Sequence, residues 1–200
     1  MTNLVQTPTT ELEAVNTMLS GADEAEVSTL TNVTTVEVEL AVKYLGQVNR
    51  AFQSKGWNFN TDYNVTYTRN ASNNIVVGSN VLSITSPTQL MALRGTKLYD
   101  RNANKNTFVW DRNITDATVV TLIDFEELPS TAREYVTIKA ARIFQAKMIG
   151  EAQVDVANRE DEMNAWATFL NDEARRSKAN MGTGTYDMIR MLHRGNNRRY

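Results

Sequence analysis

The sequence predicts an α+β fold in which an antiparallel bundle of about four helices is interrupted by a small, mainly antiparallel β-sheet domain. Apolar residues recur at helical spacing towards both ends of the chain, and they alternate with polar residues in the middle. Strands and helices do not alternate, so a doubly wound nucleotide-binding fold is not predicted. We expect N-terminal helices over 1–56, an inserted β domain over 57–127, a C-terminal helical hairpin over 128–181 and a flexible docking tail over 182–200.

The first two helices carry recognisable start and stop signals. A threonine precedes the acidic first turn of a helix that Gly21 can close. A second helix is expected over 35–54, ahead of Gly56. Its apolar residues form one stripe that should face the core, namely Val38, Ala41, Leu45, Val48 and Phe52.

The middle of the chain, 57–125, is expected to form strands, because its apolar residues alternate or occur in short runs. The expected segments are an alternating strand over 57–67, a turn at 70–74, short runs at 75–77 and 81–85, a hairpin pairing 97–100 with 107–110, and a strand at 119–123.

A third helix is predicted between Pro129, which is tolerated in a first turn, and Gly150. It is apolar on two sides. One side holds Ala132, Val136, Ala140, Ile143 and Phe144, and the other holds Tyr135, Ile138, Ala146 and Ile149. Such a helix is usually buried between partners, in a bundle core or at a subunit interface.

A fourth helix is expected over 152–180, with a single apolar stripe of Met163, Trp166, Leu170 and Ala174. The connection at 150–151 is short, so the third and fourth helices should form an antiparallel hairpin.

Composition and charge exclude several classes of function. The chain has no cysteine, which excludes disulfides and a cysteine nucleophile, and no run of about 20 apolar residues that could span a bilayer. The start does not resemble a signal peptide, so we expect assembly in a cytoplasm. The formal net charge is -2. The C-terminal end of the chain is basic, with the arginines Arg190, Arg194, Arg198 and Arg199. This segment is either a solvated tail or a docking segment for an acidic partner or nucleic acid.

No catalytic or cofactor-binding motif is evident, and we expect neither a metal nor a cofactor. The single histidine, His193, lies in the basic tail, and nucleotide-binding and zinc-protease motifs are absent from the sequence. The one enzymatic alternative is a polysaccharide hydrolase with a carboxylate pair. Its candidates are Asp124, Glu126 and Glu127 before the third helix, and Glu160, Asp161 and Glu162 in the fourth.

Several segments resemble the tail tubular protein A family, the head-to-tail adaptors, or gatekeepers, of T7-like short-tailed bacteriophages. The most specific is the block 48–60, Val-Asn-Arg-Ala-Phe-Gln-Ser-Lys-Gly-Trp-Asn-Phe-Asn. Shorter similarities occur at 11–16, 27–30, 98–101, 128–129, 139–144 and Gly150. The similar segments occur in the same order as in the family over roughly residues 10 to 187, and the similarity is weakest after residue 187.

The resemblance implies a structural, non-enzymatic virion protein at the head–tail junction. Adaptors of this family form a ring of about twelve copies below the portal. The nozzle protein, tail tubular protein B, docks on the other side, and double-stranded DNA passes through without sequence-specific binding. No membrane partner is implied. Tyr135, Ile138, Ala146 and Ile149 are then candidates for contacts with a neighbouring subunit or the portal. A remaining alternative is a DNA-binding module that acts through the arginine tail.

Overall fold

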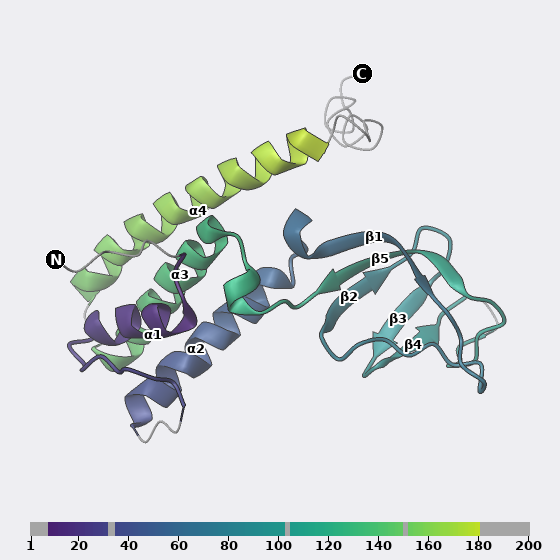
Figure 1. Cartoon of the computed structure of the whole chain (residues 1–200), viewed down its shortest axis with the longest axis horizontal. Helices are drawn as coiled ribbons and strands as arrows, with labels where there is room; N and C mark the ends of the chain where they lie inside the picture. The colour runs from purple at the N-terminus through teal and green to yellow at the C-terminus, as the bar shows by residue number, and fades with distance from the viewer. Residues whose placement is uncertain (1–7, 32–34, 103–104, 150–151, 181–200) are drawn as a thin grey trace.

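The computed structural model describes residues 8–31, 35–102, 105–149 and 152–180, with side chains outside 152–158 and 178–180. It confirms the α+β class. Helices form one end of the molecule and strands form the other, as Figure 1 shows. The sheet segment leaves the helices after α2 and returns to them before α3.

The first two helices form where the sequence predicts them. Helix α1 (Glu11–Ser20) starts with a capping box: the Glu13 amide donates to Thr10 Oγ1 at 3.2 Å, and the Thr10 amide donates to Glu13 Oε2 at 2.8 Å. Helix α2 (Val36–Gln53) buries the whole predicted stripe. Gly56 follows with φ of 74°, a left-handed conformation that glycine adopts without strain.

Helix α3 (Ser130–Met148) lies in the middle of the helical part and packs against α1, α2 and α4. Pro129 is its N-cap and not a first-turn residue, which corrects the predicted start by one position. Helix α4 (Ala152–Asn180) runs back along α3, so the predicted hairpin of these helices is confirmed.

The strands form two antiparallel sheets. The larger has the order β1-β5-β2, with β1 (Thr61–Tyr67), β5 (Ile114–Thr121) and β2 (Val81–Thr85). Thr61 pairs with Val120, and Ile84 pairs with Val119. The smaller is a hairpin of β3 (Met91–Arg94) and β4 (Lys97–Asp100).

The predicted hairpin of 97–100 with 107–110 is wrong beyond its first pair. β4 pairs with β3 through a two-residue turn, in which Gly95 has φ of 61°. Only a single bridge joins Asp100 to Thr107. Trp110 instead turns inward, where it is 1% exposed, and its indole donates to the Leu98 carbonyl at 3.0 Å.

The start of the predicted first strand is also wrong. Residues 58–60 form a short 3-10 helix, and β1 begins at Thr61. The indole of Trp57 donates to the Phe52 carbonyl at 2.8 Å, and its ring lies 4.8 Å from that of Phe169 on α4. Trp57 therefore belongs to the packing of the helices.

Two hydrophobic clusters stabilise the chain. The larger joins α1, α2, α3 and α4 around Leu45, Phe52, Val136 and Phe144. The smaller fills the space between the two sheets, around Ile75, Leu98, Trp110 and Ile114.

The predicted stripe of α4 is wrong in part. The helix buries Ala165 and Phe169 and half-buries Trp166, whereas Met163 is 66% and Leu170 39% exposed. Ala174 is also exposed. The packed face of α4 is therefore rotated from the predicted stripe by about one residue.

Candidate assembly surfaces

A groove crosses the helical part between α2, α3 and α4. Its first hollow, about 320 Å³, is mostly apolar and is lined by Tyr44, Gln47, Val48, Ala51, Phe52, Lys55, Tyr135, Lys139 and Ile143. Its second hollow, about 410 Å³, is lined by Lys55, Tyr135, Arg142, Arg159, Glu162, Met163 and Trp166. The hollows share Lys55 and Tyr135. We call the two together the aromatic groove.

Neighbouring aromatic rings, tilted against one another, form the floor of the aromatic groove. The ring of Tyr135 lies 5.3 Å from that of Phe52 and 4.8 Å from that of Trp166. Helix α2 supplies Phe52 from its core stripe and Tyr44 and Ala51 from neighbouring positions, and Lys55 follows in the turn after the helix. The floor is therefore continuous with the core and rigidly held.

Cations surround this aromatic floor. Lys55 Nζ lies 4.9 Å from the centre of the Trp166 ring. Lys139 Nζ donates to the Tyr135 hydroxyl at 3.0 Å and lies 3.4 Å from Glu162 Oε1. Arg142 Nε donates to Glu162 Oε2 at 2.6 Å. With exposed Arg159, the groove holds four cationic side chains against one carboxylate.

The protonated form of Lys139 is favoured in this setting. Partial burial acts to lower the pKa of Lys139, but its hydrogen bond to Tyr135 and the nearby Glu162 carboxylate outweigh burial and raise the pKa above its ordinary value. Lys139 therefore keeps its positive charge at neutral pH.

A further hollow, separate from the aromatic groove except for the shared residue Arg142, lies between α1, α3 and α4. It has a volume of about 540 Å³ and includes Ile138, Ala141 and Gln145 of α3 and Asp161 of α4. Gln145 Nε2 donates to the Gly21 carbonyl at 2.6 Å, which ties α3 to the end of α1.

The four interface candidates of α3 lie in three different places. Tyr135 is 5% exposed and forms part of the aromatic floor. Ile138 is half-buried in the hollow between α1 and α4. Ala146 and Ile149 are exposed at the C-terminal end of α3. Their contacts with a partner stay a prediction, and they do not form one continuous surface.

The arginine candidates Arg190, Arg194, Arg198 and Arg199 lie outside the described residues. Sequence reasoning missed Tyr44, Lys55, Trp166 and Arg159 as surface-forming residues. The available signal was a second row of residues along α2 and the turn after it, since Tyr44, Ala51 and Lys55 recur at intervals of seven and four residues.

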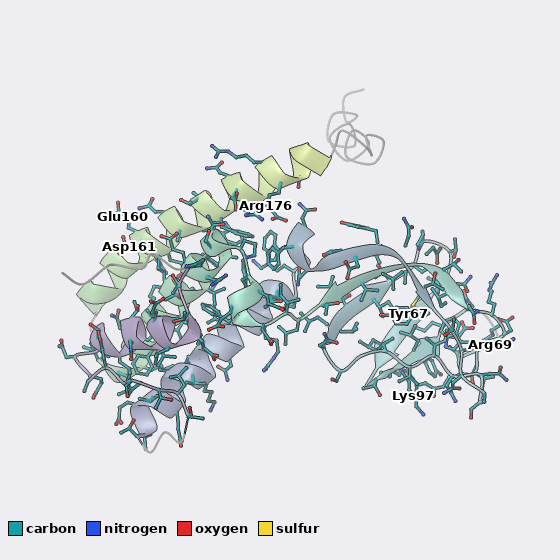
Figure 2. All side chains as sticks on the ribbon, in the orientation of Figure 1. Tyr67, Arg69, Lys97, Glu160, Asp161 and Arg176 are labelled. Atoms are coloured by element: carbon teal, nitrogen blue, oxygen red, sulfur yellow. The ribbon has the colours of Figure 1, made fainter. Side chains whose placement is uncertain are left out.

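The carboxylates considered for a hydrolase differ in their exposure and in their partners. Asp124, Glu126 and Glu127 are exposed. Glu160 and Asp161 are exposed on α4, as labelled in Figure 2, far from Arg69 and Lys97 at the end of the sheet. Glu162 is held by Lys139 and Arg142. Within the described ranges, no group of three or more His, Asp or Glu side chains is arranged to hold a metal ion.

None of the helices in the described part of the chain combines the length and apolar character needed to cross a membrane.

The model of a family described as tail tubular protein matches residues 12–179, which include nearly all of α1 and α4 and the whole of α2, α3 and β1–β5. No curated protein matches the chain.

Proposed function

We propose, because this chain belongs to the tail tubular protein family of phages, that it is the ring-forming adaptor between the head and the tail. As a member of that family it is a structural component of the virion tail. In the proposed assembly, about twelve copies form a closed ring below the portal. The tail nozzle protein docks on the opposite side, and double-stranded DNA passes through the channel during ejection.

The observation that carries this proposal is the extent of the family match, which covers the helices and both sheets and not one isolated motif. The surface of the helices supports it. The first hollow of the aromatic groove is mostly apolar, and Met148, Ile149 and Met163 are more than one third exposed. Exposed apolar surface of this kind is suited to burial against a neighbouring subunit.

The channel of such a ring should not hold the DNA. Each Lys or Arg that contacts a phosphate adds to a salt-dependent affinity. We therefore place the cation-rich aromatic groove at a protein contact and not on the channel wall. The formal net charge of -2 agrees with DNA that passes without tight binding.

The alternative of a polysaccharide hydrolase has no specific support. Glu162 already binds two cations, and its neighbours Glu160 and Asp161 are exposed. We therefore propose that the protein is not an enzyme. Replacing Glu126 and Glu127, or Glu160 and Glu162, by Gln should then leave any sugar release by assembled tails unchanged.

Electron microscopy tests the adaptor directly. Purified portal protein of the same phage, mixed with this chain, should gain one ring of density on its tail-facing side, and a mass measurement should give the copy number. Portal particles with no added density would contradict the proposal. If the C-terminal arginines of the chain instead bind DNA, the DNA binding should be sensitive to salt and should disappear on deletion of residues 190–200.

A further inference from the structure

We propose that the aromatic groove of each copy receives the acidic loop Asp23–Glu26 of the neighbouring copy. The inference rests on the proposed ring and names the two surfaces that join its subunits. In a ring whose subunits contact one another through two different surfaces, the two patches on each subunit must be complementary to each other. The groove and the loop are opposite in charge, and they lie on separate parts of the subunit.

The loop is presented in a fixed conformation at the end of α1. The Asn16 side chain forms two hydrogen bonds with the backbone of Val27: Nδ2 donates to its carbonyl and Oδ1 accepts from its amide, both at 2.9 Å. The Glu24 amide donates to the Leu19 carbonyl at 3.0 Å. These bonds fix both ends of the loop, and the side chains of Asp23, Glu24 and Glu26 are exposed.

The charge of the loop is complementary to that of the groove. Residues 1–42 contain seven carboxylates and no Lys or Arg: Glu11, Glu13, Asp23, Glu24, Glu26, Glu37 and Glu39. No cation of this segment can therefore neutralise the loop. The groove has four cations and one carboxylate. Opposite charges of this kind select the partner and its orientation, while the apolar floor supplies buried area.

The two patches do not overlap. Helix α1 packs on α2 and α3, but it contributes no residue to the lining of the aromatic groove. On α3, Tyr135 and Lys139 face the groove, whereas Ile138 and Gln145 face the side of α1. One copy can therefore use its loop and its groove at the same time, as a closed ring requires.

Cysteine cross-linking tests the contact. The chain has no native cysteine, so a disulfide between two copies must join introduced cysteines. A variant with Glu24→Cys and Lys55→Cys, oxidised in the complex with portal, should give a ladder of disulfide-linked oligomers on a non-reducing gel. The two single variants mixed should give only dimers. The matched control combines Glu24→Cys with Lys97→Cys on the far end of the sheet, and it should give no ladder.

Charge reversal gives an independent readout. Changing Lys55 and Arg159 to Glu, or Glu24 and Glu26 to Lys, should raise the concentration needed for ring formation about tenfold, since two exposed ion pairs are lost and replaced by repulsion. The variant with all four changes should recover most of that loss, because complementarity is restored with the signs exchanged. Circular dichroism should show unchanged folding of the monomers.

The outcomes separate this contact from the proposed function. If the wild-type chain adds no ring to portal, the adaptor proposal fails, and the contact fails with it. If wild-type rings form but the double-cysteine variant gives no ladder and charge reversal has no effect, only the contact is wrong. Dimers from Lys55→Cys alone would show a groove-to-groove contact and would also overturn it.

Discussion

The side-chain amide of Gln53 and the backbone of Ile123 are joined by two reciprocal hydrogen bonds. Gln53 Nε2 donates to the Ile123 carbonyl at 2.9 Å, and the Ile123 amide donates to Gln53 Oε1 at 2.9 Å. Asn60 adds to the same junction, because its Nδ2 donates to the carbonyls of Gln53 and Thr121. Gln53 is fully buried at the end of α2, so these amides fix the sheet segment to the helices where the chain leaves and returns.

Replacing Gln53 by Leu should therefore destabilise the protein by about 1–3 kcal/mol, because two backbone groups of Ile123 lose their partners in a partly buried site. Urea denaturation followed by circular dichroism measures the loss, and hydrogen exchange at the Ile123 amide should accelerate. Gln47→Leu is the matched control, since Gln47 is exposed on the same helix. Equal unfolding midpoints for both variants would contradict this role.

The helices could be predicted from sequence, but the sheet pairing could not. Local signals such as the Thr10 cap, the stripe on α2 and Gly56 act within one element, so a single sequence contains them. Pairing is non-local. The run around Phe108 looked like a strand partner for β4, yet only Thr107 of that run bridges β4, Trp110 fills the core, and the Gly95 turn pairs β3 with β4.

Phe169 on α4 should be far more important for stability than its apolar neighbour. Its ring is 1% exposed and lies 5.0 Å from Phe52 and 4.8 Å from Trp57. Phe169→Ala should cost about 3–5 kcal/mol, because it leaves a cavity among these rings.

Leu170→Ala is the control for that change, since Leu170 is exposed and its loss should cost less than about 1 kcal/mol. Both values follow from thermal or urea unfolding. If Phe169→Ala and Leu170→Ala lost similar stability, the packed face of α4 would include Leu170, as the sequence predicted.

Two acidic residues explain why the predicted apolar stripe of α4 was partly wrong. Glu162 and Glu173 are on the packed side of α4, where a hydrophobic pattern predicts no charge. Glu162 binds Lys139 and Arg142, and Glu173 Oε1 accepts from the Asn58 amide at 2.6 Å. Polar partners supplied by other elements make these positions acceptable, and such partners are invisible in one segment of sequence.

Ile138→Asp should impair ring assembly more than it unfolds the monomer. Ile138 is half-buried beside the hollow between α1 and α4, so an aspartate there can keep contact with water. Val136→Asp, two residues earlier in the core, is the destabilising reference because Val136 is fully buried. Melting temperature and ring mass measured together separate the effects. A loss of folding by Ile138→Asp equal to that of Val136→Asp would assign Ile138 to an ordinary core.

The carboxylate of Asp172 should make the stability of the protein depend on pH in the acid range. Arg176 Nε donates to Asp172 Oδ2 at 3.1 Å, and the Thr131 hydroxyl at the start of α3 donates to the same oxygen at 2.9 Å. The bond from Arg176, and then that from Thr131, lower the pKa of Asp172 below its ordinary value of 3.8. The stabilisation is therefore present above pH 3.8 and is lost as the pH falls through the lowered pKa.

Asp172→Asn should accordingly lower the free energy of unfolding by about 0.5 kcal/mol at neutral pH, since the group is close to the surface. Urea midpoints of the wild type and the variant should converge as the pH is lowered, because protonated Asp172 no longer pairs with Arg176. Arg176→Gln should reproduce most of the effect, and in the Asp172→Asn background it should add little. Fully additive losses would mean that the two side chains act independently and that the link between α3 and α4 does not depend on this pair.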